Sequence, residues 1–150
     1  MITLIVYGLD QFVVGDLSRD MTPGLAKLYE VDEENIVFIA PQNMVFHKGV
    51  EQTSWNVLIH VHAPMKVSVL QDQVSDFIIA SIGEIAIHKT LEFYYYSQDN
   101  RFEKIDETYP RFMSDDNLVD VDAEYNEDLE EGEDEDQIYT GDIFSDLPNK

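Results

Sequence analysis

Residues 55–63 have the sequence Trp-Asn-Val-Leu-Ile-His-Val-His-Ala and contain the clearest alternation in the chain. One set of alternate positions is apolar: Trp55, Val57, Ile59, Val61 and Ala63. The other set is mixed: Asn56, Leu58, His60 and His62. Because side chains two residues apart point to the same face of a strand, the stretch predicts a strand with one core face and one mixed face, ended by Pro64.

The residues that follow predict a helix and another strand. Between residues 67 and 86, apolar positions recur near a 3.6-residue period: Leu70, Val74, Phe77, Ile78, Ile82 and Ile85. This spacing is typical of an amphipathic helix. Residues 91–96, Leu-Glu-Phe-Tyr-Tyr-Tyr, favour a strand. Residues 97–112 alternate charges with single aromatic residues, as in an extended arm or a short helix.

The residues before this region repeat the same order. Residues 2–7 form a β-branched run closed by Gly8, which predicts a first strand. Residues 11–29 have helical spacing but contain Thr22-Pro23. The pattern therefore indicates either two helices, the second capped by Thr22, or one kinked helix. Residues 35–40 predict a second strand stopped by Pro41, and residues 44–47 predict a short additional strand.

Together these elements predict a duplicated β-α-β architecture. The fold class is α+β, with a four-stranded mixed sheet and two helices on one face. The other face then needs a partner, because its surface is too aromatic to be left wholly in water. Five residues are expected on that face: His60, His62, Glu92, Tyr94 and Tyr96.

Charge divides the chain into two parts. The formal net charge is −22, and residues 114–150 contain fifteen of the 31 acidic residues but only one lysine. We therefore expect a folded domain at residues 1–113 and an acidic, disordered tail at residues 114–150. Nucleic acid and membranes are not expected as partners, because their phosphates are bound by Lys and Arg.

The sequence also indicates a cellular location. The chain contains no cysteine, which excludes disulfides and cysteine nucleophiles. Residues 1–9 are apolar but lack a basic region, and Gly8 and Asp10 follow too soon for a signal peptide or a membrane span. We expect a cytoplasmic protein.

The acidic tail has more than one interpretation. Residues 120–131 place acidic oxygens in part of a calcium-loop register. Tyr125 stands where that loop needs Gly, so a folded EF-hand is not expected. Residues 143–147, Ile-Phe-Ser-Asp-Leu, would suit docking on a protein partner or back on the chain's own domain, and the acidity of the tail favours a basic partner. A solubilising tail is the alternative that we favour.

No established catalytic motif occurs in the sequence. It lacks GxSxG, a P-loop, GxGxxG and HExxH, and no cofactor is expected. His60 and His62 lie two residues apart on one strand and could share a metal ion. Two imidazoles without a third ligand favour packing or hydrogen bonding in the sheet over a metal site.

In layout, residues 1–112 resemble a small bacterial domain family related to the tautomerases and to macrophage migration inhibitory factor. The resemblance rests on a strand at the N-terminus, the Thr22-Pro23 helix, and the segments at 36–40, 55–63, 67–86 and 91–96. It implies a homotrimer whose sheets form a central barrel, and keto–enol chemistry in which an N-terminal proline acts as general base. Here position two is Ile2, whose bulk is expected to leave Met1 in place. The resemblance therefore supports the fold and argues against the family reaction.

The resemblance also implies where a pocket would lie, because in the superfamily the active site is near the start of strand one and includes residues of the last strand. The candidates are Met1, Ile2, His60, His62, Glu92, Tyr94 and Tyr96. None is assigned a catalytic role.

Two functions of different class follow from these expectations. The first is a non-catalytic oligomer that binds a protein partner. The second is a small-molecule isomerase or ligand-binding protein that uses a pocket between subunits, with Met1 or Tyr94 in place of the proline.

Overall fold

The computed structural model describes residues 1–113 of the 150-residue chain. The acidic tail, with the partial calcium-loop register and the docking segment at 143–147, lies outside the described residues. Within them the regular elements are β1 (Ile2–Tyr7), α1 (Gln11–Tyr29), β2 (Ile36–Ile39), β3 (Phe46–His47), β4 (Val50–Glu51), β5 (Asn56–Pro64), α2 (Gln71–Ile82) and β6 (His88–Tyr96). Short 3-10 segments are Glu33–Asn35, Met65–Leu70, Gly83–Ile85 and Gln98–Asn100.

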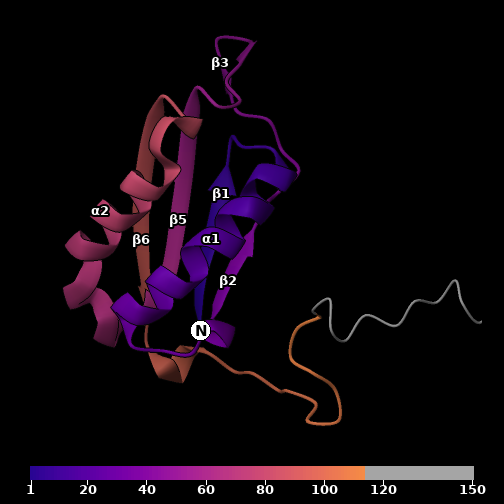
Figure 1. Ribbon diagram of the computed structural model, residues 1–150, viewed down its shortest axis with the longest axis vertical. Coiled ribbons are helices and arrows are strands. Elements are labelled where there is room, and N and C mark those ends of the chain that lie inside the picture. Colours follow the sequence, from indigo (N-terminus) through magenta and orange to yellow (C-terminus); the bar gives the residue numbers. More distant parts are fainter. Residues whose placement is uncertain (114–150) are drawn as a thin grey trace, which may run out of the picture. The chain divides into compact units, whose positions relative to one another are not determined.

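The main sheet has four strands in the order β2-β1-β5-β6. β1 is parallel to β2 and antiparallel to β5, while β5 is parallel to β6. Each parallel pair is joined by one of the two helices, and both helices cover the same face of the sheet (Figure 1). The predicted α+β class, with a mixed four-stranded sheet and two helices on one face, is confirmed.

The core lies between the sheet and the two helices. Alternate strand positions supply it, as the alternation in residues 55–63 predicted: Ile2, Leu4, Val6, Val57, Ile59, Val61 and Ala63 are all buried. Leu25 of α1 and Val74 and Ile78 of α2 complete it at 0% exposure. Burying each large apolar side chain stabilises the fold by about 1.5–3 kcal/mol, so this layer holds the sheet and helices together.

α1 is one continuous helix through Thr22-Pro23, so the alternative of two helices is wrong. Asp10 caps its first turn, because Asp10 Oδ1 accepts a hydrogen bond of 2.8 Å from the Phe12 amide. Thr22 does not cap a second helix; its hydroxyl donates to the Ser18 carbonyl at 2.7 Å. The buried stripe of α1 continues on both sides of Pro23, and this packing outweighs the hydrogen bond that proline cannot make.

α2 is shorter than the helix predicted over residues 67–86. Its α-helical part ends at Ile82, because Gly83 adopts a positive φ of 50° that breaks the helix. Ile85, which the periodicity placed on the buried stripe, is exposed in the 3-10 segment that follows. The stripe within the helix is confirmed, since Val74, Ile78 and Ile82 are buried.

The position of Trp55 also differs from the prediction. The alternation placed it on the core face, but β5 begins at Asn56 and the Trp55 side chain is 55% exposed. The reason is a turn before the strand, in which Ser54 has a φ of 60° and the Trp55 amide donates to the Gln52 carbonyl. The indole ring lies edge-on to the His88 ring, with centroids 5.9 Å apart.

The short strand predicted at residues 44–47 is present only at Phe46–His47, where it pairs with Val50–Glu51 as a hairpin. Lys48 and Gly49 both have positive φ, as a two-residue hairpin turn requires. Residues 97–112 contain one short 3-10 helix, Gln98–Asn100, so the short helix is present at their start; after it the described chain has no further regular element. No helix within residues 1–113 combines the length and apolarity that crossing a membrane demands.

Candidate functional site

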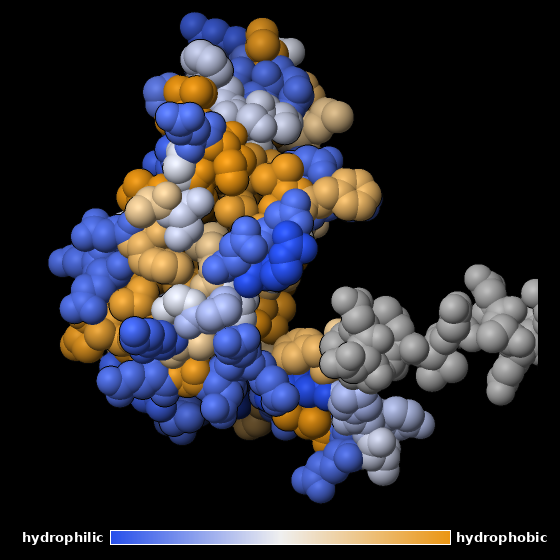
Figure 2. All heavy atoms as spheres, viewed as in Figure 1, coloured by the Kyte–Doolittle hydropathy of each residue, from blue (hydrophilic) through white to orange (hydrophobic). Residues whose placement is uncertain are grey.

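The sheet face opposite the helices carries the residues that the sequence placed there. His60 lies between Ile5 of β1 and Glu92 of β6, and His62 lies between Thr3 and Tyr94. The helices cover the other face, where Figure 2 shows hydrophobic residues reaching the surface among hydrophilic ones. We call the surface of Thr3, Ile5, Tyr7, His60, His62, Glu92, Tyr94 and Tyr96 the open face.

Five residues at the centre of the open face contact one another; we call Tyr7, His60, His62, Glu92 and Tyr94 the histidine–tyrosine cluster. His60 Nε2 lies 3.2 Å from Glu92 Oε2, and the Tyr94 hydroxyl donates to the same oxygen at 2.6 Å. The His60 ring packs edge-on against Tyr7 and Tyr94, with centroids 5.1 and 5.0 Å apart. The His62 ring stacks on Tyr94 at 4.9 Å. One carboxylate therefore orders two rings from neighbouring strands.

The environment of Tyr94 disfavours its use as a base. Its hydrogen bond to Glu92 raises the pKa of the phenol above the usual value, and desolvation and the Glu92 charge act in the same direction. Tyr94 therefore stays neutral and donates a hydrogen bond at physiological pH. The suggestion that Tyr94 replaces the family proline finds no support in this geometry.

The rings of His60 and His62 lie on the same sheet face, as predicted for residues two positions apart on a strand, with centroids 6.4 Å apart. Within residues 1–113, no group of three or more His, Cys, Asp or Glu side chains is placed to hold a metal ion. His60 and Glu92 alone would fill only two positions of a tetrahedral ion.

The start of β1 forms a second feature, which we call the Met1 depression. It has a volume of about 310 Å³ and is lined by Met1, Pro64, Tyr96, Gln98, Arg101 and Glu103. The Tyr96 hydroxyl donates to the Met1 carbonyl at 2.5 Å, and Arg101 Nη2 lies 3.2 Å from Met1 Sδ. Tyr96, not Tyr94, is therefore the tyrosine that joins the last strand to residue 1.

Ile2 does not belong to a pocket, although the resemblance made it a candidate. Its side chain is 2% exposed, because it lies on the helix-facing side of β1 within the core. Of the remaining candidates, Met1 and Tyr96 lie together at the Met1 depression, and His60, His62, Glu92 and Tyr94 lie together on the open face.

Burial and nearby charges alter the pKa of the Met1 α-amine. Burial lowers the pKa of this amine below its ordinary value, and Arg101, then Arg111 and Lys66, lower it further, while Glu103 opposes them. Glu103 Oε1 lies 3.4 Å from Arg101 Nη2 and 2.6 Å from Arg111 Nη2, so it is shared by two cations. A lowered pKa increases the neutral fraction of the amine near pH 7.

A neighbouring hollow of about 310 Å³ shares Tyr96 and Arg101 with the Met1 depression and also contains His62. Tyr96 and Arg101 thus lie beside both features. Sequence reasoning missed Arg101, Glu103 and Arg111. The available signal was the presence of two arginines in the arm of a chain with only nine basic residues.

Comparisons with known proteins bear on the fold. The sequence matches no protein-family model and no curated protein. The structure is similar to a domain of unknown function (DUF1904) from Sebaldella termitidis, with 19% identity, a TM-score of 0.62, and coverage of 69% of this chain and 95% of that one.

Two further similar structures are named after macrophage migration inhibitory factor. A macrophage migration inhibitory factor homologue from Prochlorococcus marinus has 13% identity and a TM-score of 0.54, covering 69% of this chain and 94% of that one. A macrophage migration inhibitory factor-like protein from Entamoeba histolytica has 10% identity and a TM-score of 0.53, covering 69% and 93%. The chain therefore has a tautomerase-like fold, similar to that of these migration inhibitory factor proteins, and at these identities the similarity extends to the fold alone.

Proposed function

We propose that this chain, built on the tautomerase-type fold, is a non-catalytic protein that self-associates through its open face and binds a protein partner. The observation that carries the proposal is the histidine–tyrosine cluster. Its rings pack on one another, the Tyr94 hydroxyl donates to Glu92 and His60 lies 3.2 Å from the same carboxylate, yet the rings lie on the sheet face that the helices do not cover. Large aromatic side chains with one polar end are enriched in protein interfaces.

The chemistry at residues 1 and 2 supports a role without the family reaction. That reaction uses an exposed N-terminal proline, whereas this chain has Ile2 in its core. The Met1 carbonyl is bound by Tyr96, and the Met1 thioether contacts Arg101. These contacts hold residue 1 in place without supplying a secondary amine.

A homotrimer is the assembly that we propose, since the resemblance implies it. A stable interface buries roughly 1,200–2,000 Å² in total, more than the cluster alone provides. The arm after β6 offers further apolar surface, because Phe102 is 93% and Tyr109 72% exposed.

The partner proposed for the acidic tail is a basic protein surface. Residues 114–150 carry fifteen acidic residues, and complementary charge accelerates association and excludes partners of like charge. The alternative role of the tail is to keep the assembly soluble.

The self-association is tested by light-scattering mass of the full chain and of two variants. Tyr94→Glu places a carboxylate beside Glu92 on the open face, and we expect it to convert a trimer to a monomer. Val69→Glu is the matched control, because Val69 is 84% exposed in Met65–Leu70 away from the open face. A monomeric unmodified chain, or equal masses for both variants, would refute the proposal.

A second candidate function, a small-molecule isomerase or ligand-binding protein, is favoured by the Met1 depression alone. A neutral amine beside Arg101 and Arg111 could accept a proton while the arginines hold a carboxylate. The test is the enol-to-keto conversion of an arylpyruvate, followed by ultraviolet absorbance for the full chain and for Arg101→Ala. A rate equal to the uncatalysed one, or an unchanged rate in Arg101→Ala, removes this candidate.

A further inference from the structure

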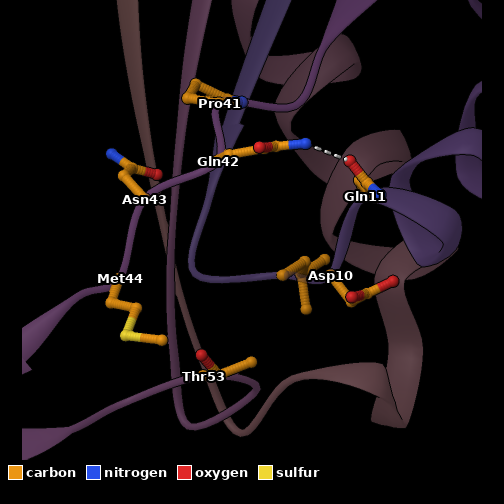
Figure 3. A pocket seen from close by; sticks show the side chains of 8 residues that line it. Asp10, Gln11, Pro41, Gln42, Asn43, Met44 and Thr53 are labelled. Carbon is orange, nitrogen blue, oxygen red and sulfur yellow. Dashed lines mark hydrogen bonds between the residues drawn. The ribbon is translucent and has the colours of Figure 1, made fainter. Parts of the chain in front are cut away.

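An open cavity lies at the end of β1 opposite Met1, where the chain turns into α1 (Figure 3). Its volume is about 520 Å³, within the usual range for small-molecule sites. Its lining comes from the turn after β1, the start of α1, residues 41–44 after β2, and Thr53 before β5. Neither the open face nor the Met1 depression includes these residues.

Two glutamines form one side of the cavity. Gln42 Nε2 donates a hydrogen bond of 2.9 Å to Gln11 Oε1, and Figure 3 shows the two side chains pointing toward each other. This bond leaves the Gln11 Nε2 donors and the Gln42 Oε1 acceptor for a ligand. A lactam, in which an N–H adjoins a C=O, offers a donor and an acceptor that match groups of this kind.

Apolar groups line other parts of the cavity. Leu9 is buried at 7% exposure, whereas Met44 is 68% exposed and its side chain extends into the space above Thr53 (Figure 3). Methionine sulfur packs favourably against aromatic rings, and its flexible stem adapts to the shape of a ligand. A flat ring in the cavity would remove part of Met44 from water.

Charge limits the class of ligand. Asp10 is the charged residue of the lining, and one of its oxygens already accepts from the Phe12 amide. The described lining contains no Lys or Arg, and the chain carries a net charge of −22. A phosphate or carboxylate on the ligand would therefore be repelled.

We propose that this cavity binds a neutral, planar heterocycle with a lactam edge, of the kind found in a free pyrimidine base. The Gln11–Gln42 pair hydrogen-bonds the edge, and Leu9 and Met44 contact the ring. The site is independent of self-association and of the Met1 depression.

The test is a titration of the ¹⁵N-labelled full chain with uracil, observed through the side-chain amide signals of Gln11 and Gln42. We expect saturable shifts of both signals. Two ligand controls have matched rings: 1,3-dimethyluracil, which has no lactam N–H, and uridine monophosphate, which adds a phosphate. Both are expected to bind at least about tenfold more weakly, the effect of losing roughly 1.4 kcal/mol of interaction.

Variants locate the site. Gln42→Leu is expected to weaken uracil binding about tenfold, and Met44→Ala to weaken it severalfold; both residues are exposed, so the fold is not at risk. Gln73→Leu on the exposed side of α2 is the matched control and should bind as the unmodified chain does. Absence of saturable shifts, equal affinity in Gln42→Leu and Gln73→Leu, or equal affinity for dimethyluracil or the monophosphate would overturn the proposal.

Discussion

Single hydrogen bonds decide how residue 1 and the open face are organised. The hydrogen bond between Tyr96 and Met1 joins positions far apart in the sequence. On β6 the Tyr94 hydroxyl donates to Glu92, and His60 Nε2 of β5 lies 3.2 Å from the same carboxylate oxygen. Alternation predicted which side chains share a face, because strand geometry has a period of two. It did not predict Arg101 and Glu103, because they lie on an arm whose path depends on tertiary contacts.

Tyr96→Phe removes the hydrogen bond to the Met1 carbonyl. We expect the free energy of unfolding to fall by about 0.5–1.5 kcal/mol, measured by urea denaturation. Tyr109→Phe on the exposed arm is the control and should stay within about 0.5 kcal/mol of the unmodified chain. A variant Tyr96→Phe as stable as the control would show that this bond contributes nothing to stability.

Tyr29 makes the free energy of unfolding depend on pH in the alkaline range. Burial raises the pKa of this phenol well above its usual value, with a smaller contribution from Tyr95. A raised folded-state pKa stabilises the fold at pH values below about 10, where the unfolded phenol titrates, and this stabilisation is lost as pH rises through the folded-state value.

The free energy of unfolding should therefore fall more steeply above pH 10 in the unmodified chain than in Tyr29→Phe. The difference between the two slopes should approach about 1.4 kcal/mol per pH unit. Equal slopes in urea denaturation at pH 8 to 11 would mean that Tyr29 is not the residue responsible.

Among the elements, α1 depends most on its surroundings. Local signals at Thr22-Pro23 left open two helices or one kinked helix, and tertiary packing keeps one helix, because Met21 and Leu25 on either side of the proline are buried. The hydrophobic period predicted that a helix exists. The period could not decide its continuity, since this depends on contacts with the sheet that are distant in sequence.

Close packing of α1 on α2 predicts the effect of changing Gly24. A Cβ at this position would overlap the ring of Phe77 on α2. Gly24→Ala gains up to about 1 kcal/mol in helix propensity, but overpacking costs about 1–3 kcal/mol, so we expect a net loss of stability. Gly15→Ala is the matched control on the same helix, because a Cβ there has open space and should stabilise. A thermal melting temperature that rises in both variants would contradict this account.

At the scale of the whole molecule, charge opposes the assembly proposed for the open face. Each chain carries −22, and fifteen of its acidic residues lie beyond residue 113. The net charge follows from the composition, and the resemblance predicted a trimer. Neither predicted the Met1 depression or the glutamine-lined cavity, because these form where segments from several parts of the chain meet.

Raising the salt concentration should therefore strengthen self-association. The screening length falls from about 10 Å at 0.1 M to about 3 Å at 1 M, which reduces repulsion between like-charged copies. Sedimentation at increasing sodium chloride should show a falling dissociation constant. Replacing the tail acids with Asn and Gln should reduce this dependence, and a dissociation constant that rises with salt would contradict the repulsion.

The hydrogen bond between Tyr96 and Met1 also constrains how the protein folds during synthesis. Within this domain β1 is made before the other elements, and it lies inside the sheet, between β2 and β5. Its antiparallel neighbour is not complete until residue 64 has emerged, and the hydroxyl that binds its first residue arrives only with residue 96. Contacts so distant in sequence form slowly, so the nascent chain holds β1 without its antiparallel neighbour until residue 64 has been made. A factor that binds the emerging N-terminus would protect the chain during that interval.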